Sequence, residues 1–345
     1  MDLRREECCQ AAGINERVLS LQGSRTRLVS RPMDPELAAA ATMLEKIDPD
    51  NLVAHREVLR RLHADQTQRW TSDLVTMEDL VPGTTGQSPP VPVRIYRPLG
   101  LASEAPTLLW LHGGAFSLGF AAIDDDLCTR IAAAAGYVIV SPEYRLAPEH
   151  PFPAGFSDCL ETYKWLLGGP ATVGVDPNCI VVGGTSAGAG LAACVCLKLR
   201  DDGCRLPAVQ LLACPVIDDR LQTMSMTEFV DTPVLDQYQA RLMWRRYLSS
   251  WDDEVPPYAA AGRAQDLRGL PPAYIETAHY DPLRDEGIEY ARRLLEAGNS
   301  VELHHFPGTF HSFDMIVPSA AISRRAFQNF VDVLRAAASK NAGRA

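Results

Sequence analysis

The chain has 345 residues, of which 46% are hydrophobic and 22% are charged, as is ordinary for a folded globular protein. Its net charge of −10 argues against a nucleic-acid partner, because phosphate binding requires clustered lysine and arginine. No stretch is apolar for long enough to predict a membrane span, and the N-terminus contains acids and lacks the apolar core of a secretory signal.

The cysteines indicate a reducing environment. Cys179, Cys194, Cys196 and Cys214 fall inside expected strands or helices, where cysteine usually behaves as a small buried hydrophobic residue. No C-x-x-C pair is present, and on a helix the thiols of Cys194 and Cys196 would point about 200° apart. We therefore expect no metal site and a cytoplasmic location.

Residues 1–70 are expected to be mostly helical. Asp34 and Pro35 introduce an alanine- and leucine-rich run in the way that a helix cap and a first-turn proline do. Asp50 is expected to open a second helix. No residue pattern here indicates catalysis, so the segment is expected either to pack over another part of the chain or to remain a solvated helical tail.

From Thr71 onward the pattern predicts strands alternating with helices. Segments 73–80 and 91–97 flank a turn-rich insert and predict an antiparallel pair. Further strands are expected at 107–111, 137–140, 180–182, 208–214, 273–277 and 301–306, and helices at 124–135, 156–167, 187–199, 284–297 and 319–338. This alternation predicts a single α/β domain with a mainly parallel central sheet flanked by helices.

Residues 218–262 interrupt the alternation. They contain no expected strand and are rich in methionine and aromatic residues. An insertion of this kind after a sheet strand is typical of a cap over the strand ends, although a surface excursion with its own small core has the same composition. Trp244, Trp251 and Tyr258 fit either a substrate pocket or the core of such a cap.

Gly184-x-Ser186-x-Gly188 follows an expected strand and precedes an expected helix, which is the context of a nucleophile elbow. The glycines are needed because a Cβ two residues from the serine would collide with neighbouring backbone in so tight a turn. The turn lifts the Ser186 hydroxyl above the sheet. It also leaves the Ala187 N–H at a helix N-terminus, where it can stabilise an oxyanion.

The overlapping segment 188–193 matches the dinucleotide fingerprint G-x-G-x-x-A. However, five residues separate its first glycine from Val182, and position 208, where an acid is expected, is alanine. Close helix–sheet packing explains Gly188 and Gly190 more simply. We therefore expect no nucleotide cofactor.

A serine nucleophile needs a base, and the base needs an orienting acid. His311 lies in a loop just past the last expected strand, and Asp281 lies in the loop after the preceding one. Asp285 and Glu286 fall in a first helical turn, where acids commonly complement the helix dipole. We therefore predict that Ser186 is the nucleophile, His311 the base and Asp281 the acid, in the chain order of α/β-hydrolases.

The predicted oxyanion hole draws on another strand end. Gly113 and Gly114 follow the strand at 107–111 and can present bare backbone N–H groups close to a substrate. Together with Ala187 they would supply the hydrogen-bond donors for a tetrahedral intermediate.

Five motifs in this order resemble the hormone-sensitive-lipase-like, or family IV, microbial carboxylesterases: H-G-G-A-F (112–116), Y-R-L-A-P-E-H-P-F-P-A (144–154), G-T-S-A-G-A-G (184–190), D-P-L-R-D-E-G (281–287) and H-S-F (311–313). Thr185 is similar to the G-T-S-A-G branch of that family. The resemblance implies an α/β-hydrolase fold with a cap from about 1–70 and 218–262, and hydrolysis of short- to medium-chain acyl esters through an acyl-enzyme. It also implies frequent dimerisation, so we expect a small-molecule ester substrate and a homodimer.

The chain departs from the family pattern in two places. Ala115 replaces the third glycine of the H-G-G-G motif, but the first two are the usual donors. His279 and Tyr280 add bulk before Asp281, which would either narrow the pocket or bring His279 near substrate.

Two alternatives to a carboxylesterase remain. One is an amidase or a drug-deacetylating esterase, because the same groups serve both acyl bonds. The other is a non-catalytic receptor like the plant gibberellin receptors, which the retention of Ser186 and His311 disfavours.

Overall fold

The computed structural model describes residues 32–44, 50–66, 73–82, 89–101, 104–249 and 254–342. Residues 1–31 of the expected cap and Trp251 lie outside these ranges. None of the helices in the described part of the chain is long and apolar enough to cross a membrane.

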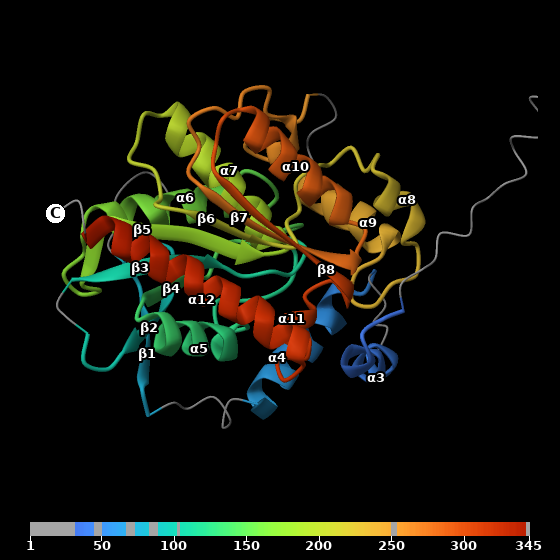
Figure 1. Cartoon of the computed structure of the whole chain (residues 1–345), viewed down its shortest axis with the longest axis horizontal. Helices are drawn as coiled ribbons and strands as arrows, with labels where there is room; N and C mark the ends of the chain where they lie inside the picture. The colour runs from blue at the N-terminus through green and yellow to red at the C-terminus, as the bar shows by residue number, and fades with distance from the viewer. Residues whose placement is uncertain are drawn as a thin grey trace, which may run out of the picture. The chain divides into compact units, whose positions relative to one another are not determined.

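A central sheet organises the fold (Figure 1). Its spatial order is β1 (Val75–Leu80), β2 (Val93–Pro98), β4 (Val138–Pro142), β3 (Ala105–Leu111), β5 (Val175–Thr185), β6 (Gln210–Ala213), β7 (Ala273–Tyr280) and β8 (Val301–Phe310). β2 pairs antiparallel with both β1 and β4, and the remaining neighbours pair in parallel. The predicted mainly parallel sheet and the antiparallel pair are confirmed.

Helices cover both faces of the sheet. α6 (Ala154–Leu167), α7 (Ala187–Asp201) and α10 (Arg284–Glu296) lie on one face, and α5 (Asp125–Ala135) and α12 (Ala321–Ala342) on the other (Figure 1). In β5, Ile180 and Val182 pack in the core beneath the first set of helices, whereas Val181 packs in the core beneath the second. A strand buried on both faces requires the continuous apolar run seen in the sequence.

The N-terminal helices begin at side-chain caps. Asp34 caps α3 (Pro35–Met43) as predicted, because its carboxylate accepts a hydrogen bond from the Glu36 N–H at 2.9 Å. α4 (Leu52–Gln66) is capped by Asn51, whose side-chain oxygen accepts from the Ala54 N–H at 3.1 Å. The prediction that Asp50 opens this helix was wrong by one residue.

The 218–262 insertion contains α8 (Met224–Glu228), α9 (Gln237–Tyr247) and the start of a 3₁₀ turn, η3 (Ala261–Arg263), and no strand among its described residues. Figure 1 shows α3, α4, α8 and α9 on the side of the sheet toward which the parallel strands point. Arg56 holds α4 there by donating to the Ser117 carbonyl at 2.9 Å and by pairing with Glu149 at 2.7 Å. The Tyr238 hydroxyl of α9 donates to Asp50, just before α4, at 2.8 Å, so the two segments are in contact.

Candidate active site

Ser186 stands at a sharp turn between β5 and α7. Its backbone has φ 54° and ψ −120°, a conformation that is strained for a residue with a side chain. The surrounding backbone holds it there: the Ser186 N–H donates to the Ala213 carbonyl at 2.8 Å, and the Ser186 carbonyl accepts from the Gly190 N–H at 3.0 Å. This is the turn that the G-x-S-x-G pattern predicts.

Space explains the glycines around this turn. A Cβ at Gly184 would lie 2.3 Å from the Leu111 carbonyl oxygen, and one at Gly188 would lie 1.9 Å from the same atom. A Cβ at Gly190 would lie 2.3 Å from the Val216 carbonyl oxygen. These glycines let α7 approach the sheet, which confirms the packing interpretation of Gly188 and Gly190.

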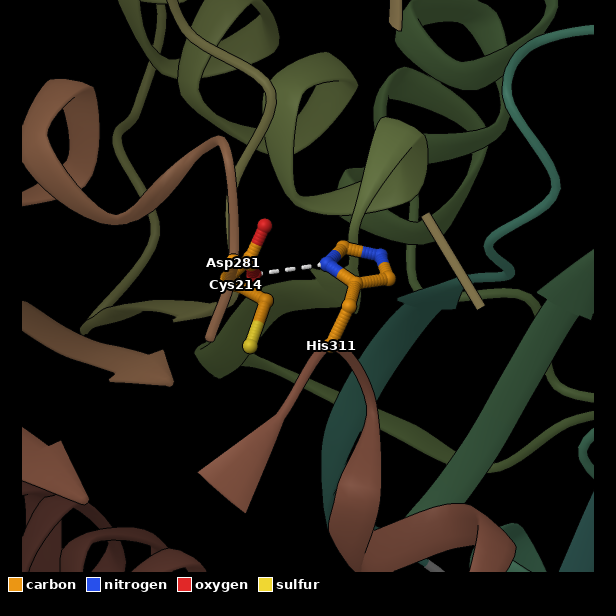
Figure 2. Close-up of side chains that lie close together, drawn as sticks. All are labelled: Cys214, Asp281 and His311. Carbon is orange, nitrogen blue, oxygen red and sulfur yellow. Dashed lines mark hydrogen bonds and ion pairs between the residues drawn. The ribbon is translucent and has the colours of Figure 1, made fainter. Parts of the chain in front are cut away.

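His311 and Asp281 meet because they follow paired strand residues. Tyr280 of β7 pairs with Phe310 of β8, so the next residue of each strand emerges at the same edge. The His311 Nδ1–H donates to Asp281 Oδ2 at 2.7 Å (Figure 2). Asp281 Oδ1 accepts from the Leu283 N–H at 2.9 Å. A ring held through Nδ1 leaves its Nε2 free to act as a base.

Ser186 and His311 line one cavity of about 300 Å³. Both are almost fully buried, at 7% and 4% exposure. Among the residues that the structure describes, no hydrogen bond joins the serine hydroxyl to the imidazole. Catalytic contacts of this kind often tighten only when substrate binds.

The glycine loop after β3 borders the same cavity. A Cβ on Gly113 would lie 3.6 Å from the Ser186 Cβ, and Gly114 has φ 117°. Ala187 is the first residue of α7, so its N–H has no acceptor within the helix. Within the described ranges, none of these three N–H groups takes part in a hydrogen bond. All three donors are therefore available to an oxyanion.

Ala115 occupies the position of the third family glycine and adopts φ 53°. A left-handed conformation costs an alanine on the order of 1 kcal/mol, which a large fold tolerates. The replacement leaves Gly113 and Gly114, the two predicted donors, in place.

The His112 side chain forms a hydrogen bond with the glycine loop. Its Nδ1–H donates to the Gly113 carbonyl at 2.7 Å, and the Tyr144 hydroxyl donates to the His112 carbonyl at 2.7 Å. The two rings stack with centroids 4.1 Å apart. Burial lowers the pKa of His112 to about 4, so the ring is neutral at neutral pH.

Acid should weaken the fold through this histidine. An unfolded histidine titrates near pH 6.5 and His112 in the fold near 4, so between these values only the unfolded chain binds the proton. Stability therefore falls as the pH falls through this window, by up to about 3 kcal/mol. His112→Asn keeps a hydrogen-bond donor near the position of Nδ1. In this variant the free energy of unfolding, measured with urea, should differ less between pH 7 and pH 4.5 than it does in the wild type. The exposed His150 provides the control, because His150→Asn should show the same difference in the free energy of unfolding between the two pH values as the wild type. An equally large difference in His112→Asn would contradict the role given to His112.

The cap elements supply half of the remaining residues of the cavity wall. These residues are His55 and Leu59 of α4, and Val234, Leu235, Gln239, Leu242, Met243 and Arg246 in and before α9. Burial, and secondarily Arg246, lowers the pKa of His55. Sequence reasoning missed these polar residues because a helix face can be assigned to a pocket only when its packing partner is known.

The structure describes two of the three cap aromatics left open by the sequence, Trp244 and Tyr258. Trp244 is 4% exposed and lies 5.7 Å from the Phe116 ring. The Tyr258 hydroxyl donates to Asp201. Neither residue is among those of the described chain that line the cavity, and the same holds for His279, which stacks on Tyr280 at 4.6 Å.

Cys214 lies beside the His311–Asp281 pair, with ligand atoms of all three residues within 4.8 Å of one another (Figure 2). Burial, and secondarily the nearby Asp281, raises the pKa of the Cys214 thiol well above its ordinary value. Metal binding requires the thiolate, and the His311 Nδ1 is already bonded to Asp281. The cluster therefore fits a hydrogen-bonded His311–Asp281 pair better than a set of metal ligands.

Comparisons with known proteins agree with this geometry. The family described as alpha/beta hydrolase fold matches residues 108–315. Carboxylesterase NlhH of Mycobacterium tuberculosis is 40% identical over 240 residues, which cover 67% of this chain and 74% of that protein. Esterase LipI of the same organism is 39% identical over 231 residues, covering 66% and 72%.

Solved structures are similar over most of the chain. The structure titled Bacterial Heroin Esterase has a TM-score of 0.85 and 44% identity, covering 88% of this chain and 98% of that one. The esterase LipW from Mycobacterium marinum has a TM-score of 0.82 and 38% identity, covering 88% and 96%.

Proposed function

This chain belongs to the alpha/beta hydrolase fold family and is a carboxylic ester hydrolase, and we propose that Ser186, His311 and Asp281 are its catalytic triad. The observation that carries the proposal is the convergence of three strand ends. Ser186 and His311 border one cavity, and Asp281 accepts a 2.7 Å hydrogen bond from the His311 ring. The similar proteins named above as esterases do not favour the receptor alternative.

The arrangement supports a two-step reaction. His311 Nε2 takes the hydroxyl proton as the Ser186 oxygen attacks the ester carbonyl, and the resulting oxyanion accepts hydrogen bonds from Gly113, Gly114 and Ala187. The bond to the alkoxy group then breaks, and the leaving oxygen takes the proton from His311. A water molecule, deprotonated by the same ring, attacks the acyl-enzyme; the bond between the acyl carbon and the Ser186 oxygen breaks, the ring returns the proton to that oxygen, and the acid is released. Asp281 stays ionised and stabilises the imidazolium.

Short- to medium-chain acyl esters are the substrates that the cavity supports best. Its volume of about 300 Å³ lies at the lower end of the range for small-molecule sites. The predicted cap, from about 1–70 and 218–262 within a single domain, is supported by the contribution of α4 and α9 to the lining. We therefore place the acyl group in a pocket of restricted length.

A series of p-nitrophenyl esters tests this substrate class. The value of kcat/KM should peak at butyrate or octanoate and be at least about tenfold lower for palmitate, because a long chain exceeds the pocket. A maximum at palmitate would contradict the assignment. An acetylated drug added to the series tests the drug-deacetylating alternative, which the similarity to a heroin esterase supports. The p-nitroanilide with the same acyl group tests the amidase alternative.

Cellular location and assembly are further proposals. Cys128, Cys159, Cys179, Cys194, Cys196, Cys204 and Cys214 are free thiols in the described chain, which supports the predicted reducing, cytoplasmic compartment. The homodimer rests on the family resemblance, and light scattering of the purified protein tests it.

A further inference from the structure

The inner wall of the cavity carries a carboxyl group that the triad does not use. Asp124 directly precedes α5, lines the cavity together with Ser186, and is 3% exposed. Its Oδ2 accepts a hydrogen bond from the Trp110 Nε1–H at 2.8 Å. Its Oδ1 accepts none from any residue that the structure describes, and it is not among the fully buried atoms without a partner, so it is open to the cavity. A carboxylate in so little-exposed a site is poorly solvated, so it favours a proton or a ligand that donates or carries positive charge.

The neighbouring acid is compensated, whereas Asp124 is not. Asp125 accepts hydrogen bonds from Arg94 at 3.0 Å and from the Tyr96 hydroxyl at 2.6 Å. No ion pair of the described chain includes Asp124. The cavity therefore contains an acidic group without a basic partner of its own.

Burial is the main influence on the ionisation of Asp124. Burial raises the pKa of Asp124 to about 7, the Trp110 hydrogen bond lowers it, and the nearby carboxyls of Asp125 and Asp314 raise it further. Near neutral pH the group can therefore ionise readily when a positive charge arrives. Leu118, Ile123 and Met315 line the same cavity and offer apolar contacts for the carbon substituents of an alkylated nitrogen.

The position of Asp124 in the sequence has an ordinary explanation. Asp124 is the first of three consecutive acids at the start of a predicted helix, where acids commonly complement the dipole. In the structure it precedes the helix, but its side chain makes no capping hydrogen bond. Its carboxyl group is therefore not used for the role that its position suggests.

We propose that Asp124 is a specificity-determining residue that favours esters carrying an alkylammonium group, whose positive charge its carboxylate holds while Ser186 attacks the ester carbonyl. The proposal rests on the function assigned to Ser186 above. Binding of the charged end at the inner wall would orient the ester within the cavity, and a neutral analogue of the same shape would lose this attraction.

A matched pair of esters tests the proposal. Acetylcholine and 3,3-dimethylbutyl acetate have the same shape, with a cationic nitrogen in the first replaced by carbon in the second. The wild-type protein should have the higher kcat/KM for acetylcholine. Asp124→Asn should lower the ratio of the two kcat/KM values at least about tenfold, because the buried charge partner is lost. Asparagine keeps the size of the side chain and an acceptor for Trp110, and the ratio cancels any general loss of activity.

Asp126 provides the matched control. It lies two residues further along the chain in α5, pairs with Arg130 and is 40% exposed. Asp126→Asn should leave the ratio unchanged. Equal ratios in the wild type and Asp124→Asn would overturn the proposal and leave Asp124 only as the hydrogen-bond partner of Trp110.

Failure of the proposal can be distinguished from failure of the triad assignment. If the wild type hydrolyses p-nitrophenyl butyrate but does not prefer the cationic ester, only the role of Asp124 is refuted. If no ester is hydrolysed, calorimetry on Ser186→Ala still tests Asp124: acetylcholine should bind more tightly than its neutral analogue, and equal affinity refutes the role. If Asp124→Asn does not fold, tetramethylammonium should inhibit the wild type more strongly than neopentyl alcohol, and equal inhibition would again refute it.

Discussion

Replacing Ser186 by alanine should lower kcat/KM for p-nitrophenyl butyrate by a factor on the order of 10⁶. The change removes the proposed nucleophile, so only the proposed oxyanion donors and the binding cavity would remain to accelerate the reaction. The free energy of unfolding should change little, because the hydroxyl makes no hydrogen bond with another described residue and the side chain is small. Steady-state kinetics and urea unfolding of the same preparations test both statements.

Ser141 at the end of β4 is the control for this substitution. It is also a buried serine, and its hydroxyl has no partner in the described chain. Ser141→Ala should retain kcat/KM within about threefold, because Ser141 does not line the cavity and the change removes only a hydroxyl without a partner in the described chain. Ser186→Ala turnover within tenfold of the wild type would exclude this serine as the nucleophile.

Replacing Asp281 by asparagine should lower kcat about 10⁴-fold. The carboxylate now accepts the His311 Nδ1–H at 2.7 Å, which leaves Nε2 unprotonated. An amide would present its N–H₂ to Nδ1 as readily and favour the ring with its proton on Nε2. That tautomer cannot take the proton from Ser186. The pH dependence of kcat for p-nitrophenyl butyrate should also change, because the imidazolium loses its negative partner.

Asp285 is the control for this second substitution because it belongs to the same D-P-L-R-D-E-G motif. Its carboxylate accepts from the Ser225 N–H at 2.8 Å and pairs with Arg284. Asp285→Asn should therefore affect stability more than kcat. If Asp285→Asn lost more activity than Asp281→Asn, the orienting acid would be wrongly assigned.

The nucleophile elbow could be predicted because its cause is local. The tight turn and the approach of α7 to β3 demand small residues at Gly184 and Gly188, and the sequence shows this demand directly. The buried strands could be predicted for the same reason, since burial on both faces requires continuous apolar runs.

The meeting of Asp281 with His311 was only partly accessible from sequence. Chain order and strand ends indicate which loops approach each other. The pairing of Tyr280 with Phe310, which brings the two side chains to the same edge, depends on strand register. Register follows from packing across the whole sheet, so the sequence alone does not determine this contact.

The cavity wall could not be predicted. Trp244 turned out to be buried in the cap, whereas His55 and Arg246 border the cavity. Helical periodicity gives an apolar face but not the element against which it packs. The sequence does not distinguish Asp124 from its two acidic neighbours, because acids at the start of a helix commonly complement the helix dipole. Only the three-dimensional arrangement shows that the three acids have different roles.

Mass spectrometry of the protein after reaction with a fluorophosphonate tests the central claim most directly, because the reagent bonds covalently to an activated serine oxygen. Loss of esterase activity should parallel the formation of one adduct, located on the peptide that contains Ser186 and absent from Ser186→Ala. An adduct on another serine that accompanies inactivation, or full activity in protein modified at Ser186, would contradict the account.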